Sequence, residues 1–237
     1  MKTRVRKQKE RKIKHTRVID TLTGPLERRA LHWLAAHLPA WVTPDQLTFL
    51  SLVGAIVASA SYLLYGQSPT FLWLACLGFI INWFGDSLDG TLARYRRIER
   101  PRYGFFVDHS VDAVCTTLIF YGLSVASFMR FDIAMVVLVG YLLLTIYTCL
   151  STYAVDEFKI SYAYLGPTEI RLIAVICSIV TYLNPERFVH LPFGDYTFFE
   201  LIMLALSVLF YSAFILSTAG QTTRLAREDK PQQEKKK

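Results

Sequence analysis

Cysteine is scarce in this chain and is not arranged in pairs. Only four cysteines occur among 237 residues, each in a separate apolar stretch, and no histidine lies near them at a metal-ligand spacing. This pattern excludes a disulfide framework and a zinc site, so the cysteines are predicted to be small buried hydrophobic residues. They are Cys76, Cys115, Cys149 and Cys177.

Charged residues are also few, and they are unevenly distributed. They make up 19% of the chain, whereas 53% of the residues are hydrophobic. The first 43 residues hold eleven Lys or Arg and the last fourteen hold six, so the middle is far more apolar than the mean. Despite the net charge of +7, this disfavours a secreted soluble domain, a disordered chain and a nucleic-acid-binding module, and indicates a membrane protein. No secretory signal peptide is expected, because the N-terminal arm is long, polar and basic.

The apolar stretches predict an all-α integral membrane protein with six transmembrane helices preceded by an interfacial amphipathic helix. Residues 1–22 are expected to form a basic cytoplasmic arm, and residues 221–237 a charged cytoplasmic tail. The amphipathic helix is expected within 23–41, lying in the membrane interface or packed on the protein's own surface. The membrane domain is expected over 42–220, and lengths near 20 residues suit a bilayer. Its six helices are expected at 44–65, 71–94, 103–129, 132–154, 167–183 and 196–219.

Basic residues gather on one side of this predicted domain. The links after the first, third and fifth helices contain zero, one and one Lys or Arg, whereas both basic termini lie on the opposite side. The positive-inside rule therefore places both termini in the cytoplasm. The second helix would end, and the third would begin, on that same side.

Four aspartates lie at these predicted cytoplasmic helix ends. Asp86 and Asp89 are three residues apart and share a helix face. Asp108 and Asp112 are four apart and also share one, and the short link allows the two faces to meet. Such a cluster requires protonation or divalent cations, and carboxylate oxygens suit Mg²⁺, Mn²⁺ or Ca²⁺. Four carboxylates from two helices can hold two ions, an arrangement that serves displacement at phosphorus.

Small residues and one arginine accompany the aspartates. Gly90 and Ala93 lie on the same helix face as Asp86, and Gly104 lies on the facing helix. Gly90 leaves room for a ligand to approach the backbone, at a cost of about 1 kcal/mol in helix propensity. Arg94, one turn beyond Gly90, offers a forked donor for phosphate. These features together indicate a diphosphate pocket.

This constellation resembles the signature of the CDP-alcohol phosphatidyltransferases. The six-helix count and the cytoplasmic placement also match, so the resemblance covers about residues 42–220. The opening Pro44-Asp45-x-Leu47-Thr48 is similar to the family's Pro-Asn-x-x-Thr, with Asp45 in place of the usual Asn. All eight fixed positions of the signature are present: Asp86, Asp89, Gly90, Ala93, Arg94, Gly104, Asp108 and Asp112.

The resemblance implies a role for each of these residues. Asp86, Asp89 and Asp108 would hold two divalent ions, Mg²⁺ or Mn²⁺, with Asp112 on the second ion. Asp112 would also act as general base on the acceptor hydroxyl, whose oxygen attacks the β-phosphorus as CMP leaves. The nucleotide would be surrounded by Gly90, Ala93, Arg94 and Gly104.

Three further polar residues are candidates for binding the acceptor. His109 lies between the two aspartates of the third helix but points away from their shared face. Glu169 and Arg171 open the fifth helix on the same cytoplasmic side, and being two residues apart they do not share a face. The Gly-Pro-x-Glu run that contains Glu169 resembles choline- and ethanolamine-phosphotransferases of the same superfamily.

The leading hypothesis is a phospholipid synthase that transfers a phosphatidyl group from CDP-diacylglycerol to a small alcohol. The alternative is transfer from CDP-choline or CDP-ethanolamine to diacylglycerol. An intramembrane prenyltransferase would lack the glycine, alanine and arginine frame, and a cation carrier would distribute its acidic residues along a path across the membrane. The expected partners are therefore a CDP-linked lipid or alcohol, a hydroxyl acceptor and membrane lipids, without nucleic acid. A homodimer is left open.

Overall fold

Seven α-helices account for most of the residues that the computed structural model describes. The described residues are 16–18, 24–155, 157–159, 166–184, 188–192 and 194–229. The helices are α1 Gly24–His37, α2 Pro44–Leu63, α3 Phe71–Tyr95, α4 Pro101–Val125, α5 Phe131–Val155, α6 Pro167–Leu183 and α7 Phe198–Glu228. The predicted helix order is confirmed, and α7 extends beyond the expected boundary because the polar segment after Ala219 remains helical.

Two pairs of short strands accompany the helices, and the sequence pattern does not predict them. β1, Thr16–Val18, pairs in parallel with β2, Glu157–Lys159, so part of the expected N-terminal arm lies beside the link between α5 and α6. β3, Phe188–Leu191, and β4, Gly194–Thr197, form an antiparallel hairpin before α7. The remainder of the arm and the end of the expected tail lie outside the described residues.

Four of the described helices, α2, α3, α5 and α7, are long and apolar enough to cross a membrane. The helical class is therefore confirmed, with segments of the length and composition that a membrane requires. Helix α4 has 25 residues but carries Asp108 and Asp112, and α6 has only 17 residues. The crossing of the membrane by all six helices stays a prediction, which length and composition support for α2, α3, α5 and α7.

Capping residues mark the start of α2 as the sequence predicts. The Thr43 hydroxyl accepts a hydrogen bond from the backbone N–H of Gln46 at 3.3 Å, and the Gln46 side chain accepts one from the Thr43 backbone at 2.8 Å. Thr197 and Glu200 form the same reciprocal pair at the start of α7. These contacts satisfy backbone N–H groups that have no partner within the helix.

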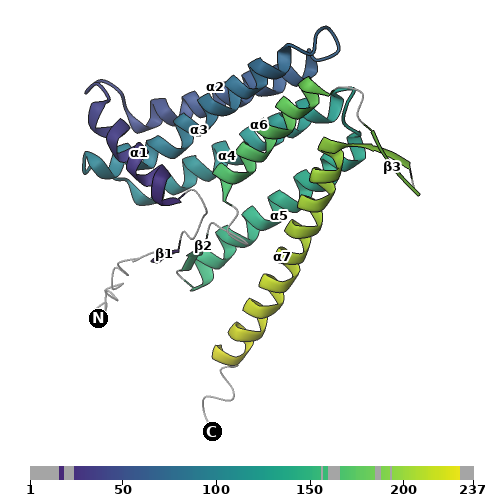
Figure 1. Cartoon of the computed structure of the whole chain (residues 1–237). Helices are drawn as coiled ribbons and strands as arrows, with labels where there is room; N and C mark the ends of the chain where they lie inside the picture. Colours follow the sequence, from purple (N-terminus) through teal and green to yellow (C-terminus); the bar gives the residue numbers. More distant parts are fainter. Residues whose placement is uncertain are drawn as a thin grey trace, which may run out of the picture.

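Helices α2 and α3 pack closely side by side and form the base on which α4 and α6 lie (Figure 1). Helix α1 crosses one end of this pair, and α5 packs along α7 in a second group of helices. The β3–β4 hairpin lies at the end of the molecule away from α1 (Figure 1). In the larger apolar core, Tyr62 makes edge-to-face ring contacts with Phe79 and Phe128.

Helix α1 divides its apolar residues between the protein and its outer surface. Leu31 and Ala35 are buried against α2 and α3, and Leu34 packs beside them. Leu26 and Trp33 are 76% and 62% exposed. One side of this helix therefore packs on the protein's own surface, as one of the two readings expects, and its position in a membrane interface stays a prediction.

We expect Gly78→Ala to destabilise the protein by about 1–3 kcal/mol, because it overfills the contact between α2 and α3. A Cβ at Gly78 would lie 2.6 Å from the backbone nitrogen of Ala58 and 2.8 Å from the backbone oxygen of Gly54. Backbone atoms cannot relieve such a clash by changing rotamer. Thermal unfolding in detergent measures the effect. Gly66→Ala is the matched control, since a Cβ there meets no heavy atom within 4 Å. Equal unfolding temperatures for the two variants would contradict the close approach.

Candidate active site

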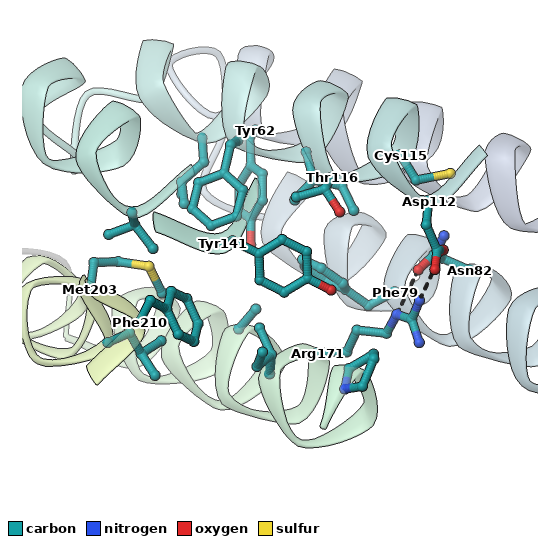
Figure 2. Close-up of a pocket in the computed structure, with 18 residues that line it drawn as sticks. Tyr62, Phe79, Asn82, Asp112, Cys115, Thr116, Tyr141, Arg171, Met203 and Phe210 are labelled. Carbon is teal, nitrogen blue, oxygen red and sulfur yellow. Dashed lines mark hydrogen bonds and ion pairs between the residues drawn. The ribbon is translucent and has the colours of Figure 1, made fainter. Parts of the chain in front are cut away.

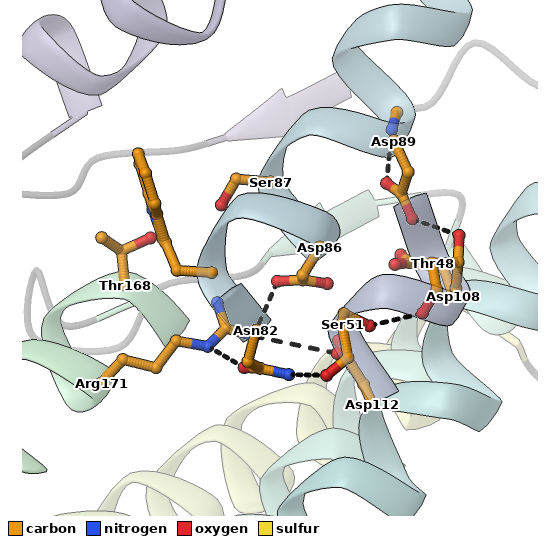
Figure 3. Close-up of polar contacts among 12 residues, drawn as sticks. Thr48, Ser51, Asn82, Asp86, Ser87, Asp89, Asp108, Asp112, Thr168 and Arg171 are labelled. Carbon is orange, nitrogen blue, oxygen red and sulfur yellow. Dashed lines mark hydrogen bonds and ion pairs between the residues drawn. The ribbon is translucent and has the colours of Figure 1, made fainter. Parts of the chain in front are cut away.

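Three of the four signature aspartates meet between α3 and α4. Asp86 lies on α3, Asp108 and Asp112 lie on α4, and one carboxylate oxygen of each lies within 4.8 Å of the others. All three residues are half-buried. Figure 3 shows them approaching one another from adjacent helices. The helix faces predicted from the spacing therefore do meet.

The fourth aspartate, Asp89, is held by α2 instead of joining this group. The Thr48 hydroxyl donates a hydrogen bond to Asp89 Oδ2 at 2.5 Å, and the backbone N–H of Gly90 donates to its other oxygen. Asp89 is only 8% exposed. The expectation that up to four carboxylates converge is thus met by three, because a hydroxyl from a neighbouring helix holds the fourth.

Arg171 supplies positive charge to the cluster of three aspartates. Its Nη2 lies 2.7 Å from Asp86 Oδ2 and 4.0 Å from Asp112 Oδ1 (Figure 3). The side chains of Arg171 and Asp86 are each 14% exposed, so water screens this ion pair weakly. Arg171, which the sequence predicts to contact the acceptor, therefore contacts the aspartates themselves.

Asn82 is a site residue that the signature does not identify. It is 1% exposed, its Nδ2 donates to the Ser51 carbonyl at 2.9 Å, and its Oδ1 accepts from Arg171 Nε at 2.7 Å. It therefore links α2, α3 and α6. An amide one turn before Asp86 in an apolar helix is a signal that could have identified it, because a buried polar side chain requires partners.

The residues expected around the nucleotide lie on an open surface beside the aspartates. The nearest atoms to a Cβ at Gly90 would be those of the Arg94 guanidinium, with Nη1 at 3.2 Å, and a Cβ at Gly104 would meet nothing within 4 Å. Arg94 is exposed and its Nη2 donates to Thr91 Oγ1 at 3.2 Å, while Ala93 is half-buried. The flexible side chain of Arg94 is thus the nearest obstacle to a ligand that approaches Gly90.

The two remaining acceptor candidates make contacts of different kinds. The His109 ring stacks on Phe105 with ring centroids 4.2 Å apart, and its Nδ1 lies 3.3 Å from Asp108 Oδ2. Glu169 is 5% exposed and accepts the backbone N–H of Gly166 at 2.9 Å. This hydrogen bond caps α6 and gives Glu169 a structural role, so its contact with an acceptor stays a prediction.

A small cavity opens beside the aspartates. Its volume is about 60 Å³, and Asn82, Asp112 and Arg171 line its polar end (Figure 2). Aromatic and aliphatic side chains line the rest, including Phe79 and Tyr141. Asp112 therefore belongs to the cluster of three aspartates and also borders a space that can admit a small polar group.

A model of the CDP-alcohol phosphatidyltransferase family matches residues 41–217 of the chain. Archaetidylinositol phosphate synthase of Pyrococcus horikoshii is 29% identical over 99 residues, which are 42% of this chain and 50% of that protein. Cholinephosphotransferase 1 of Danio rerio is 31% identical over 97 residues, which are 38% of this chain and 25% of that protein. The matched region thus spans half or less of the length of these curated relatives.

A solved structure has the same fold. The crystal structure of Mycobacterium tuberculosis phosphatidylinositol phosphate synthase with CDP-DAG bound superimposes with a TM-score of 0.51 and 20% identity, covering 82% of this chain and 90% of that chain. The family match includes α2 to α6, most of α7 and every signature residue. The resemblance inferred from the aspartates is confirmed, and the chain belongs to the CDP-alcohol phosphatidyltransferase family.

Proposed function

We propose that the protein is a membrane enzyme that transfers a phosphatidyl group from CDP-diacylglycerol to a small alcohol and releases CMP. The observation that carries this proposal is the meeting of Asp86, Asp108 and Asp112 beside an open glycine surface in a member of this family. The structural relative was crystallised with CDP-DAG bound, which supports a CDP-linked lipid as donor.

The cluster of three aspartates is suited to binding divalent cations. Three carboxylates with oxygens within 4.8 Å provide the oxygen donors that Mg²⁺ and Mn²⁺ prefer, and the buried ion pair with Arg171 supports an affinity for positive charge. We assign two ions to Asp86, Asp108 and Asp112, and we propose Asp89 as a fourth ligand through the carboxylate that Thr48 orients in this structure. When bound, the ions would offset the negative charge of the diphosphate and of the departing CMP.

Asp112 is assigned as the general base. It borders the cavity, so an acceptor hydroxyl placed there would transfer its proton to the Asp112 carboxylate. The acceptor oxygen would form a bond to the β-phosphorus as the bond from that phosphorus to the CMP oxygen breaks. Arg171 Nη1 is buried without a hydrogen-bond partner among the described residues, so it can bind an oxygen of the acceptor or of the phosphate.

Arg94 is assigned to the CDP moiety, over the surface left open by Gly90, Ala93 and Gly104. We expect Arg94→Lys to weaken CDP binding by about tenfold, because lysine cannot form the two-pronged contact with phosphate. A calorimetric titration with CDP in detergent measures this affinity. Arg130→Lys, which changes an exposed arginine before α5, is the matched control. Unchanged affinity in Arg94→Lys would remove Arg94 from the site.

We also assign the active site and both termini to the cytoplasm, six crossings to α2–α7, and an interfacial position to α1. The excess of basic residues in the two terminal segments supports this orientation. Helix α1 and the end of α7 lie away from the β3–β4 hairpin (Figure 1). The exposed Leu26 and Trp33 on α1 suit a membrane interface.

A second candidate function exchanges the roles of the two substrates. A CDP-linked amino alcohol, CDP-choline or CDP-ethanolamine, would donate to diacylglycerol with the same residues. The similarity to cholinephosphotransferase 1 of Danio rerio favours this candidate.

A transfer assay with each donor separates the two candidates. Purified protein would receive Mg²⁺ or Mn²⁺ and either labelled CDP-diacylglycerol with a panel of alcohols, or CDP-choline with diacylglycerol. The panel includes serine, inositol phosphate, glycerol phosphate and choline. We expect CMP release and a lipid of matching mass from CDP-diacylglycerol. Product from CDP-choline alone would establish the second candidate, and no product from either donor would overturn both.

A further inference from the structure

Glu27 of α1 joins three helices through one carboxylate oxygen. Its Oε1 accepts hydrogen bonds from Trp83 Nε1 at 2.8 Å, from Ser87 Oγ at 3.3 Å and from Thr168 Oγ1 at 2.8 Å. Trp83 and Ser87 lie on α3, whereas Thr168 lies in the first turn of α6. Glu27 is half-buried, and hydrogen bonds to a charged acceptor are stronger than those between neutral groups.

The residues that donate to Glu27 are close neighbours of active-site residues. Ser87 follows Asp86 on α3, and Thr168 lies three residues before Arg171 on α6, at a spacing that shares a helix face. Figure 3 shows Ser87 and Thr168 on the two helices that carry Asp86 and Arg171. A movement of the first turn of α6 against α3 would therefore change the 2.7 Å contact between Arg171 and Asp86.

The negative charge of Glu27 suits this position on α6. Thr168 is the second residue of the helix, where unpaired N–H groups and the helix dipole favour a nearby carboxylate. The carboxylate thus stabilises the start of α6 by its charge and fixes it against α3 by direct hydrogen bonds. Helix α1 precedes the region matched by the family, residues 41–217, so the family signature does not include this contact.

We propose that Glu27 is a positioning residue for the transfer reaction. It holds the first turn of α6 against α3 so that Arg171 remains on Asp86 and Asn82. Its effect on catalysis rests on the proposed function, whereas its effect on Arg171 can be measured without substrate.

The test of positioning observes the Nε–H of Arg171 by NMR in protein isotope-labelled at arginine Nε. The signal is assigned by its loss in Arg171→Lys. We expect Glu27→Ala to shift this signal and to speed its exchange with water at least about tenfold, because the contact with Asn82 loosens. Glu27→Gln keeps an acceptor oxygen and should retain the wild-type signal. Glu99→Ala, which removes an exposed carboxylate from the α3–α4 link, should also retain it.

An unchanged Arg171 signal in Glu27→Ala would overturn the proposal. If that variant does not fold, Thr168→Val removes the same hydrogen bond from the α6 side, and Thr168→Ser keeps the hydroxyl. We expect the Arg171 signal to move in Thr168→Val and to stay in Thr168→Ser. Equal spectra for these two variants would also overturn the proposal.

A double-mutant cycle tests whether Glu27 acts through Arg171. We expect Glu27→Ala to lower kcat/KM about tenfold in the wild type, but less than about twofold in the Arg171→Lys background. A purely structural role would give losses that multiply, and that result would contradict positioning through Arg171. If the wild type transfers nothing from any CDP donor, the proposed function fails, while the NMR comparison still decides the role of Glu27.

Discussion

Asp112→Asn is expected to abolish CMP release while the protein remains folded and inserted. Asparagine preserves the size of the side chain, but it cannot accept the proton of the acceptor hydroxyl and adds no negative charge to the cluster. A general base contributes about 10²–10⁴-fold to a rate, and a cation ligand is lost as well, so we expect a fall of at least about 10³-fold. The measurement is CMP formed from CDP-diacylglycerol and an acceptor by purified protein.

The fold should tolerate this change because Arg171 retains its nearer partner. Arg171 Nη2 lies 2.7 Å from Asp86 and 4.0 Å from Asp112, so the closer ion pair remains. Asp132→Asn is the matched control, since Asp132 is exposed and pairs with Arg130 before α5. Its CMP release should equal that of the wild type. CMP release that survives in Asp112→Asn would refute the assignment of the base.

Removal of divalent ions is expected to stop the reaction completely and reversibly. Three carboxylates within 4.8 Å repel one another and would repel a diphosphate, and the single charge of Arg171 offsets only part of this. Treatment with EDTA followed by dialysis should abolish CMP release, and added Mg²⁺ or Mn²⁺ should restore it.

The control for chelation is EDTA already saturated with Mg²⁺, which should leave the rate unchanged. Loss of activity in that control would indicate damage by the chelator and not removal of an ion. Full activity in the dialysed, ion-free protein would contradict a metal-dependent centre.

Local spacing was enough to predict the pairs of aspartates, because residues three or four apart share a helix face whatever surrounds them. The capping pair of Thr43 and Gln46 followed for the same reason. The direction of the Asp89 carboxylate did not follow, because it depends on a hydroxyl from Thr48, 41 residues earlier in the chain. The place of Arg171 likewise depends on how α6 packs against α3, 85 residues from its partner Asp86.

The amphipathic pattern of α1 left open whether the helix lies in the membrane interface or packs on the protein's own surface. Apolar residues occur around much of this helix, and Leu31 and Ala35 are buried while Trp33 is exposed. The contacts of Glu27 with α3 and α6 accompany that choice, and they are formed with partners 56 to 141 residues away. Glu27, a polar residue of this helix, thus proved to be a structural link, which hydrophobic periodicity does not reveal.

Simultaneous measurement of Mn²⁺ binding and CMP release tests the central claim most directly. Mn²⁺ would be titrated into metal-free protein, with the bound ion counted by electron paramagnetic resonance and CMP measured in the same samples. We predict that CMP release rises with Mn²⁺ occupancy, and that Asp86→Asn, Asp108→Asn and Asp112→Asn each lower both. CMP release without a bound ion, or unchanged Mn²⁺ binding in all three variants, would contradict the assignment of these carboxylates as the catalytic centre.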